Sequence, residues 1–290
     1  MRAPAFTFHP ALASRRRRSP WPVFFGGILL TCYPATSYAG SDSDAGFYTL
    51  KEWAPIQTWE YFAVPGALAV TLGLNLTVSP PTRWEGGILF DNWVRSGLRL
   101  SSESARTNAA NVSTVLVVAV GATPFVLDAG VLTAWVHRRG DLAWQMFMVD
   151  AEAMTLTALV TETTKRLSGR ARPSGPGEND SFFSGHASLA ATAATLVCLQ
   201  HLELELLENK AADATVCGAA ATFAFTTGVL RVMADRHWAS DVIVGGAVGV
   251  GSAFLVYRLH VRGGQVEPTA LRIGPILSPD FRGLSFAGAF

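Results

Sequence analysis

Long apolar stretches separated by short polar ones dominate the chain from residue 112 onward. The stretches cover residues 112–136, 143–164, 187–202, 211–232 and 241–259, and a shorter one, 62–78, precedes them. Runs of roughly 16 to 25 residues without period-two alternation indicate helices rather than strands. We therefore predict an all-α fold, an apolar bundle of about six helices.

Composition supports an apolar scaffold. Hydrophobic residues make up 49% of the chain, charged residues 16%, and the mean hydropathy is +0.28. Helices of this length can cross a bilayer core of about 30 Å, so we expect membrane association, with a soluble apolar bundle as the alternative. A net charge of +1 gives no electrostatic basis for binding nucleic acid.

The N-terminus resembles an export signal. Four arginines at positions 15–18 precede an apolar stretch at 23–30 and the small residues of Ser37-Tyr38-Ala39. This order is typical of a signal peptide, so we predict a segment 1–39 that is cleaved after Ala39 or kept as an anchor. The expected location is the bacterial inner membrane with the active site facing the periplasm, or the soluble periplasm.

Three further divisions follow from composition. Residues 40–111 are a mixed region, 112–262 form the helical domain, and 263–290 form a proline- and glycine-rich tail, either irregular or a small β-hairpin. The spacing of the three cysteines, Cys32, Cys198 and Cys217, does not match a metal site. We expect Cys198 and Cys217 to be small buried apolar residues, and a disulfide between them stays open.

Three short strings carry the candidate chemistry. They are Lys165-x6-Arg172-Pro173, Ser184-Gly185-His186 and Arg231-x5-His237-x3-Asp241. Cationic side chains bind the oxygens of a phosphoryl group, and imidazoles can attack phosphorus and transfer protons. The strings together predict phosphoryl transfer without a metal ion or other cofactor.

Position along the helices refines this prediction. His237 and Asp241 are four residues apart and would share a helix face, so the carboxylate can fix the imidazole tautomer. Ser184 is a candidate N-cap, and Gly185 lets a helix N-terminus approach an anion. Each string alone also fits a capped helix or a basic flank of a membrane segment. The basic flank of a membrane segment would include Arg166 and Arg170.

The triple pattern resembles the type 2 phosphatidic acid phosphatase and vanadium haloperoxidase superfamily. That family's signature reads K-x6-R-P, P-S-G-H and S-R-x5-H-x3-D. The likeness spans about residues 143–259, with Phe183 and Leu230 standing where the family usually has Pro and Ser. The resemblance implies a helical acid phosphatase/haloperoxidase-like core.

It also implies roles for individual residues. His237 would attack phosphorus, His186 would protonate the leaving alkoxide, and Asp241 would orient the nucleophile. The phosphoryl oxygens would be held by the remaining residues, Lys165, Arg172, Arg231, Ser184 and Gly185. No metal is required, and vanadate could bind as a phosphate analogue.

We therefore expect an exported phosphatase that acts on a phosphate monoester or pyrophosphate, with a phosphorylated lipid as the favoured substrate. Three alternatives remain. They are a soluble periplasmic acid phosphatase of broad specificity acting on small phosphate esters, a vanadate-dependent haloperoxidase, and a non-catalytic membrane scaffold.

Overall fold

The computed structural model describes residues 53–76, 80–175, 177–261, 272–278 and 281–287. The predicted signal segment 1–39 and Cys32 lie outside these ranges. The chain divides into two compact units, one of residues 43–264 and the other of residues 1–42 with 265–290.

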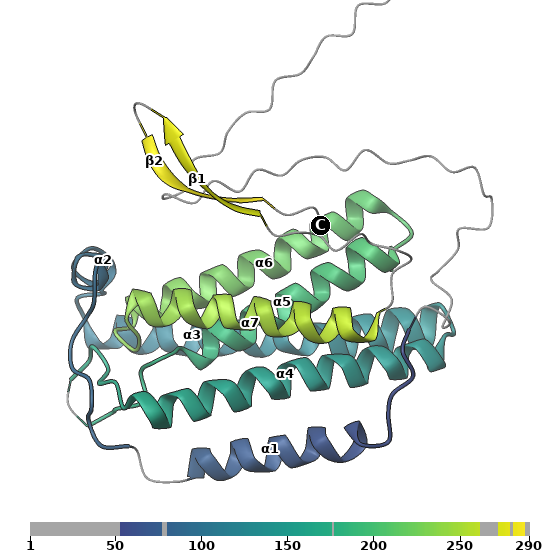
Figure 1. The fold of residues 1–290 in the computed structure, drawn as a ribbon, viewed down its shortest axis with the longest axis horizontal. Helices are drawn as coiled ribbons and strands as arrows, with labels where there is room; N and C mark the ends of the chain where they lie inside the picture. The colour runs from purple at the N-terminus through teal and green to yellow at the C-terminus, as the bar shows by residue number, and fades with distance from the viewer. Residues whose placement is uncertain (1–52, 77–79, 176, 262–271, 279–280, 288–290) are drawn as a thin grey trace, which may run out of the picture. The chain divides into compact units, whose positions relative to one another are not determined.

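The larger unit holds the helices, and the prediction of an all-α bundle is confirmed. In chain order they are α1 Glu60–Leu76, α2 Asp91–Leu98, α3 Glu103–Ala122, the π-helix η2 Thr123–Val136, α4 Gly140–Ser168, α5 Gly185–Leu204, α6 Lys210–Met233 and α7 Ala239–His260 (Figure 1). In the smaller unit, β1 Arg272–Ser278 pairs antiparallel with β2 Phe281–Ala287. This is the β-hairpin that the tail composition allowed.

Helix boundaries follow local capping chemistry. The predicted helix 112–136 in fact begins nine residues earlier, because Ser102 accepts a hydrogen bond from the Ala105 amide as an N-cap. Asn209 caps α6 in the same way. The short helix α2 was not predicted, since its eight residues are fewer than the roughly 11 to 18 over which a helical period can be recognised.

Helix α5 is the centre of the bundle and packs against α3, α4, α6 and α7. Glycines permit its close approach to α7. A Cβ atom added at Gly245 would lie 2.8 Å from the Ser184 carbonyl oxygen, and one at Gly249 would overlap the Ser188 carbonyl. The start of α5 is thereby pressed against the first turns of α7.

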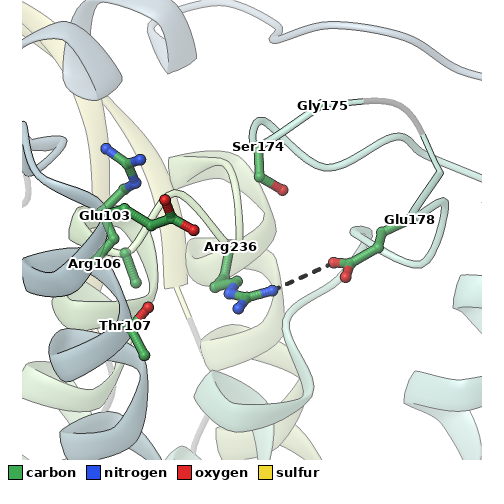
Figure 2. Close-up of a pocket in the computed structure, with 8 residues that line it drawn as sticks. Glu103, Arg106, Thr107, Ser174, Gly175, Glu178 and Arg236 are labelled. Carbon is green, nitrogen blue, oxygen red and sulfur yellow. Dashed lines mark ion pairs between the residues drawn. The ribbon is translucent and has the colours of Figure 1, made fainter.

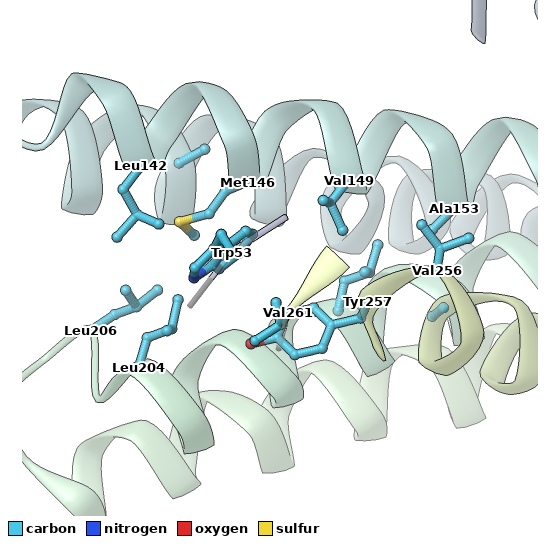
Figure 3. Packing of buried hydrophobic residues seen from close by; sticks show 13 residues of the cluster. Trp53, Leu142, Met146, Val149, Ala153, Leu204, Leu206, Val256, Tyr257 and Val261 are labelled. Atoms are coloured by element: carbon cyan, nitrogen blue, oxygen red, sulfur yellow. The ribbon is translucent and has the colours of Figure 1, made fainter. Parts of the chain in front are cut away.

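An apolar cluster holds the other end of the bundle. Figure 3 shows Trp53 among side chains of α4, including Leu142 and Met146, with Leu204 and Leu206 facing them. The Trp53 ring meets the ring of Tyr257 on α7 edge to face at 6.0 Å. Helix α1 lies on the outer face of α4 (Figure 1).

The two cysteines of the helical region are bonded. Cys198 on α5 and Cys217 on α6 form a disulfide, and both side chains are half-buried. The expectation that they are small buried apolar thiols is therefore wrong. Spacing along the sequence could not decide this point, because it does not show which faces of the two helices meet.

Four helical segments are long and apolar enough to cross a membrane. Among the residues that the structure describes, they are Glu103–Val136, Gly185–Leu204, Lys210–Met233 and Ala239–His260. Helix α1 is apolar but shorter. Large apolar side chains such as Phe62, Val115, Trp135, Phe225 and Leu259 are exposed on these helices, as lipid-facing residues would be.

Candidate active site

The three sequence strings meet at one end of the bundle. Lys165 lies in the last turn of α4, Ser184 caps α5, and Arg231 lies in the last turn of α6. The Ser184 amide donates to the Asp241 carbonyl oxygen at 3.1 Å. A Cβ atom at Gly185 would stand 3.4 Å from Lys165 Nζ, so residues far apart in sequence lie side by side here.

His237 is buried, with 3% of its surface exposed, in the turn between α6 and α7. Its Nδ1 lies 2.9 Å from the carbonyl oxygen of Ser181. A carbonyl can only accept, so Nδ1 carries the proton and donates it, and Nε2 keeps the lone pair. The tautomer needed for nucleophilic attack by Nε2 is thus fixed by the backbone.

Asp241 supports this histidine indirectly. Its Oδ2 lies 3.7 Å from His237 Nδ1, which is too long for a hydrogen bond. The same oxygen accepts from Ser181 Oγ at 2.6 Å and from the Trp238 amide at 2.9 Å. The sequence-based expectation of a direct carboxylate–imidazole hydrogen bond therefore differs from the structure, in which Asp241 positions the residue that positions His237.

Arg170 is a site residue that the alternative interpretation of the first string placed in a basic patch flanking a membrane segment. That interpretation is wrong, because the Arg170 side chain is fully buried between the carboxylates of Asp91 and Asp241. It also donates to Ser240 Oγ at 2.8 Å and stacks over the Trp84 ring at 4.0 Å. A planar guanidinium suits such stacked, multiply bonded positions, and here it anchors Asp241.

Three cations surround the imidazole. Burial lowers the pKa of His237 well below its ordinary value, and the charges of Arg231, Arg172 and Lys165 lower it further. Arg231 is buried, with 7% exposed. Lys165 pairs with Glu162 at 2.6 Å. His237 is therefore neutral near pH 7 and is placed where an anion would be attracted.

Arg172 already has acidic partners. Its Nε and one terminal nitrogen each lie 2.9 Å from the Asp180 carboxylate, and its other terminal nitrogen lies 2.7 Å from Glu178. Burial opposes the charge on Asp180, but Arg172 outweighs burial and lowers the Asp180 pKa. The loop after Arg172 thus holds its guanidinium in a fixed orientation.

His186 lies in the first turn of α5, and its Nε2 is 3.1 Å from Thr114 Oγ1. The Thr114 hydroxyl donates to the Ala110 carbonyl, so it accepts the proton of His186 Nε2, and Nδ1 is the lone-pair nitrogen of the neutral ring. The same three cations that act on His237 act on His186, which places both imidazoles around one region of positive charge. Thr114 was not identified from sequence, because one threonine in an apolar helix carries no distinctive pattern.

Comparison with known proteins finds a family similarity in this part of the chain. The family model for the PAP2 superfamily matches residues 148–264. The chain is similar to the PAP2 superfamily over those residues. The resemblance inferred from the three strings is thereby confirmed, and the matched segment contains all eight predicted site residues.

The chain is similar to two further proteins over part of its length. The lipid A 1-phosphatase of Porphyromonas gingivalis is 39% identical over 106 residues, which are 37% of this chain and 22% of that protein. The chain therefore matches about a fifth of the length of that relative. A crystal structure of a transmembrane PAP2 type phosphatidylglycerolphosphate phosphatase from Bacillus subtilis shares 20% identity and a TM-score of 0.40, covering 65% of this chain and 94% of that one.

Residues outside the PAP2 segment complete the site. Arg95 on α2 makes two hydrogen bonds to Asp235, at 2.6 and 2.8 Å, and Arg99 adds one at 2.7 Å. Arg95 also donates to the Pro173 carbonyl at 2.8 Å. Burial opposes ionisation of Asp235, yet these arginines outweigh it and lower its pKa. Helix α2 thus ties together the loop after Arg172 and the turn that carries His237.

A pocket of about 330 Å³ opens beside the PAP2 residues. Figure 2 shows Glu103, Arg106 and Thr107 of α3 on one side and Ser174, Gly175 and Glu178 on the other, with Arg236 between them. Arg236 lies 3.6 Å from Glu178, which in turn contacts Arg172. The pocket therefore continues from the cluster of cations and is lined by charges of both signs.

Proposed function

We propose that this chain is a metal-independent phosphatase that hydrolyses a phosphate monoester or pyrophosphate of a lipid. One observation carries the proposal. A buried, neutral imidazole, His237, keeps its Nε2 lone pair next to three cations. This combination suits attack on a phosphoryl group whose oxygens the cations hold.

In the proposed first step, His237 Nε2 forms a bond to phosphorus while the bond from phosphorus to the leaving oxygen breaks. His186 enters this step as the imidazolium, which the anionic substrate favours, and gives its Nδ1 proton to that oxygen, so the alcohol or phosphate leaves in its protonated form. In the second step, His186 takes a proton from water, the water oxygen bonds to phosphorus, and the phosphohistidine bond breaks. Inorganic phosphate leaves, and both histidines return to their initial states.

The other residues have supporting roles in this scheme. Lys165, Arg172 and Arg231 stabilise the charge that spreads over the equatorial oxygens. Backbone amides at the start of α5, beyond the Ser184 cap, add N–H donors. Asp241 acts through Ser181, and Arg170 acts through Asp241.

A lipid substrate is supported by the apolar surface. Four helices could cross a membrane, and the catalytic strings lie at the ends of helices, where lipid headgroups would meet the protein. We propose that the chain resides in the bacterial inner membrane with this end facing the periplasm. A disulfide such as Cys198–Cys217 is rare in a reducing cytosol, which supports export.

Phosphate release from a panel of phospholipids and soluble esters tests the activity, with detergent-solubilised and aqueous fractions assayed separately. We expect release from lipid phosphates in the detergent fraction and none with His237→Gln. His137→Gln, a histidine at the opposite end of the bundle, is the matched control. Equal activity of His237→Gln and the parent protein would overturn the proposal.

The same panel separates the alternatives. Activity in the aqueous fraction on small chromogenic esters only would indicate a soluble acid phosphatase. Halide oxidation after vanadate addition would indicate a haloperoxidase. For orientation, Ser174→Cys places a thiol at the pocket, and its modification in intact cells by a membrane-impermeant reagent is expected if this end faces the periplasm.

A further inference from the structure

A second cluster of ionisable groups lies at the opposite end of the bundle. Glu60 begins α1, His260 ends α7, and Glu152 lies on α4, and the oxygen and nitrogen atoms that they offer lie within 4.8 Å of one another. Helix α7 has 22 residues and is about 33 Å long, so this cluster is remote from His237. It takes no part in the proposed phosphatase chemistry.

The hydrogen bonds of His260 show what the cluster lacks. Nδ1 lies 3.0 Å from the Val256 carbonyl oxygen and must donate to it, so in the neutral ring Nε2 is the lone-pair nitrogen. This lone pair faces two carboxylates, Glu60 at 3.5 Å and Glu152 at 3.4 Å. With the ring neutral, three acceptors are directed at one point and repel each other, so either a second proton on His260 or a metal ion lies between them.

Burial makes that repulsion costly. The side chains of His260 and Glu60 are 8% and 6% exposed, so water cannot screen them well. The second oxygen of Glu60 accepts from the Gln57 amide at 3.1 Å. A histidine that donates its other N–H to a backbone carbonyl, beside a carboxylate fixed by its own hydrogen bond, is the usual outer shell of a metal site.

Two of the three ligand separations suit tetrahedral coordination, and the third, between the two glutamate oxygens, is within 4.8 Å. Ligand atoms about 2.0–2.1 Å from zinc at tetrahedral angles stand about 3.3–3.4 Å apart. The two separations from His260 Nε2 are 3.4 and 3.5 Å, whereas adjacent ligands of an octahedral ion at about the same bond length would stand about 3.0 Å apart. One nitrogen and two carboxylate oxygens also match the ligand types that zinc accepts.

We propose that Glu60, Glu152 and His260 bind one divalent transition-metal ion, Zn²⁺ by preference, with water as the fourth ligand. Each ligand comes from a different helix, so the ion fastens α1 to α4 and α7. Its role is structural. Helix α1 otherwise packs mainly against α4, and the ion links it to the last turn of α7.

Metal binding to the purified full chain tests this site. The protein carries no polyhistidine tag, is stripped with a chelator and is then titrated with Zn²⁺, or with Co²⁺ as a spectroscopic probe. We expect one ion per chain, intense visible absorption typical of tetrahedral Co²⁺, and an unfolding temperature raised by at least about 4 °C with saturating Zn²⁺. Phosphate release is expected to be the same with and without the chelator.

Variants locate the ion. Glu152→Gln and Glu60→Gln keep the side-chain shape and should each lower Zn²⁺ affinity at least about tenfold. His137→Asn replaces a histidine whose Nδ1 lies 3.7 Å from Glu208, and this variant should bind Zn²⁺ as the parent does. Unchanged affinity in both glutamine variants would overturn the proposal. So would a parent chain that binds less than a tenth of an equivalent and unfolds at the same temperature with and without zinc, which would indicate a protonated His260 paired with two carboxylates.

Discussion

Two buried histidines next to aspartates sit at opposite ends of this bundle, and only one is suited to catalysis. His201 is 1% exposed, with Nδ1 2.6 Å from Asp213 and Nε2 3.2 Å from Asp128. Both of its nitrogens are therefore occupied by carboxylates. His237 uses one nitrogen for a backbone carbonyl and presents the other to cations.

The comparison shows that a buried His–Asp contact is not in itself a catalytic feature. Carboxylates on both sides of His201 favour the imidazolium and hold three helical segments together. Cations around His237 favour the neutral ring and attract an anionic substrate. A buried histidine surrounded by carboxylates, such as His201, forms a structural ion pair. One surrounded by cations, such as His237, is suited to act as a nucleophile.

Substituting each histidine in turn gives the largest expected difference between the two sites. His237→Gln should lower phosphate release by at least about 10³-fold, because the attacking atom is lost, while the unfolding temperature changes little. His201→Asn should leave kcat within about threefold but lower the free energy of unfolding by about 3 kcal/mol, since two buried carboxylates lose their partner. Kinetics and thermal unfolding in detergent measure both, and the reverse result would contradict our assignment.

Arg172→Ala tests the cations around His237. Removing a fixed donor to the phosphoryl oxygens should lower kcat/KM by about 10²-fold and weaken inhibition by vanadate in parallel. Arg258→Ala is the matched control, because Arg258 makes a similar ion pair, 2.6 Å from Glu203, away from the site. Unchanged vanadate inhibition in Arg172→Ala would show that Arg172 does not bind the phosphoryl oxygens.

Asp241→Asn tests whether the carboxylate acts through Ser181. Where a carboxylate alone fixes the tautomer of a catalytic histidine, replacing it with an amide lowers kcat by about 10⁴-fold. Here the Ser181 carbonyl keeps the tautomer, so we expect a loss of only about 10-fold. Ser181→Ala should cause a similar loss, and the double variant should be no worse than either single one. Additive losses would show that the two residues act separately.

Asp235→Asn tests the arginine clamp from α2. Weaker pairing with Arg95 and Arg99 should loosen the turn that carries His237 and lower kcat by about threefold to tenfold. Glu203→Gln, which weakens a comparable arginine pair on the far side, should not change kcat. A change in KM alone would indicate that the clamp shapes the pocket rather than the turn.

The pH profile gives the smallest effect. The acidic limb of kcat/KM reports the pKa of the free base, and burial followed by three positive charges lowers the pKa of His237. The limb should therefore lie below about pH 6.5, the ordinary value for histidine. Arg172→Ala removes one positive charge, which favours the protonated ring, so the limb should move to higher pH. A shift to lower pH would contradict the proximity of the two groups.

Much of the fold could be predicted from sequence because long apolar runs without period-two alternation indicate helices. The order of the strings at helix ends likewise placed His186 and His237 at a common site. Arg170 and Ser181 could not be found in this way, since their roles depend on which chain segments touch. In a sequence, an arginine near other arginines indicates a surface position. Only the structure shows that Asp91 and Asp241 lie on either side of Arg170.

The bond between Arg170 and Asp91 has a practical consequence for anyone expressing this protein in parts. Family similarity begins at residue 148, and a truncation designed on that boundary would discard Asp91, Arg95 and Arg99. The remaining piece would keep every residue proposed to contact phosphate yet lose the Asp91 carboxylate that pairs with Arg170 beside Asp241. A minimal active fragment has to start before α2.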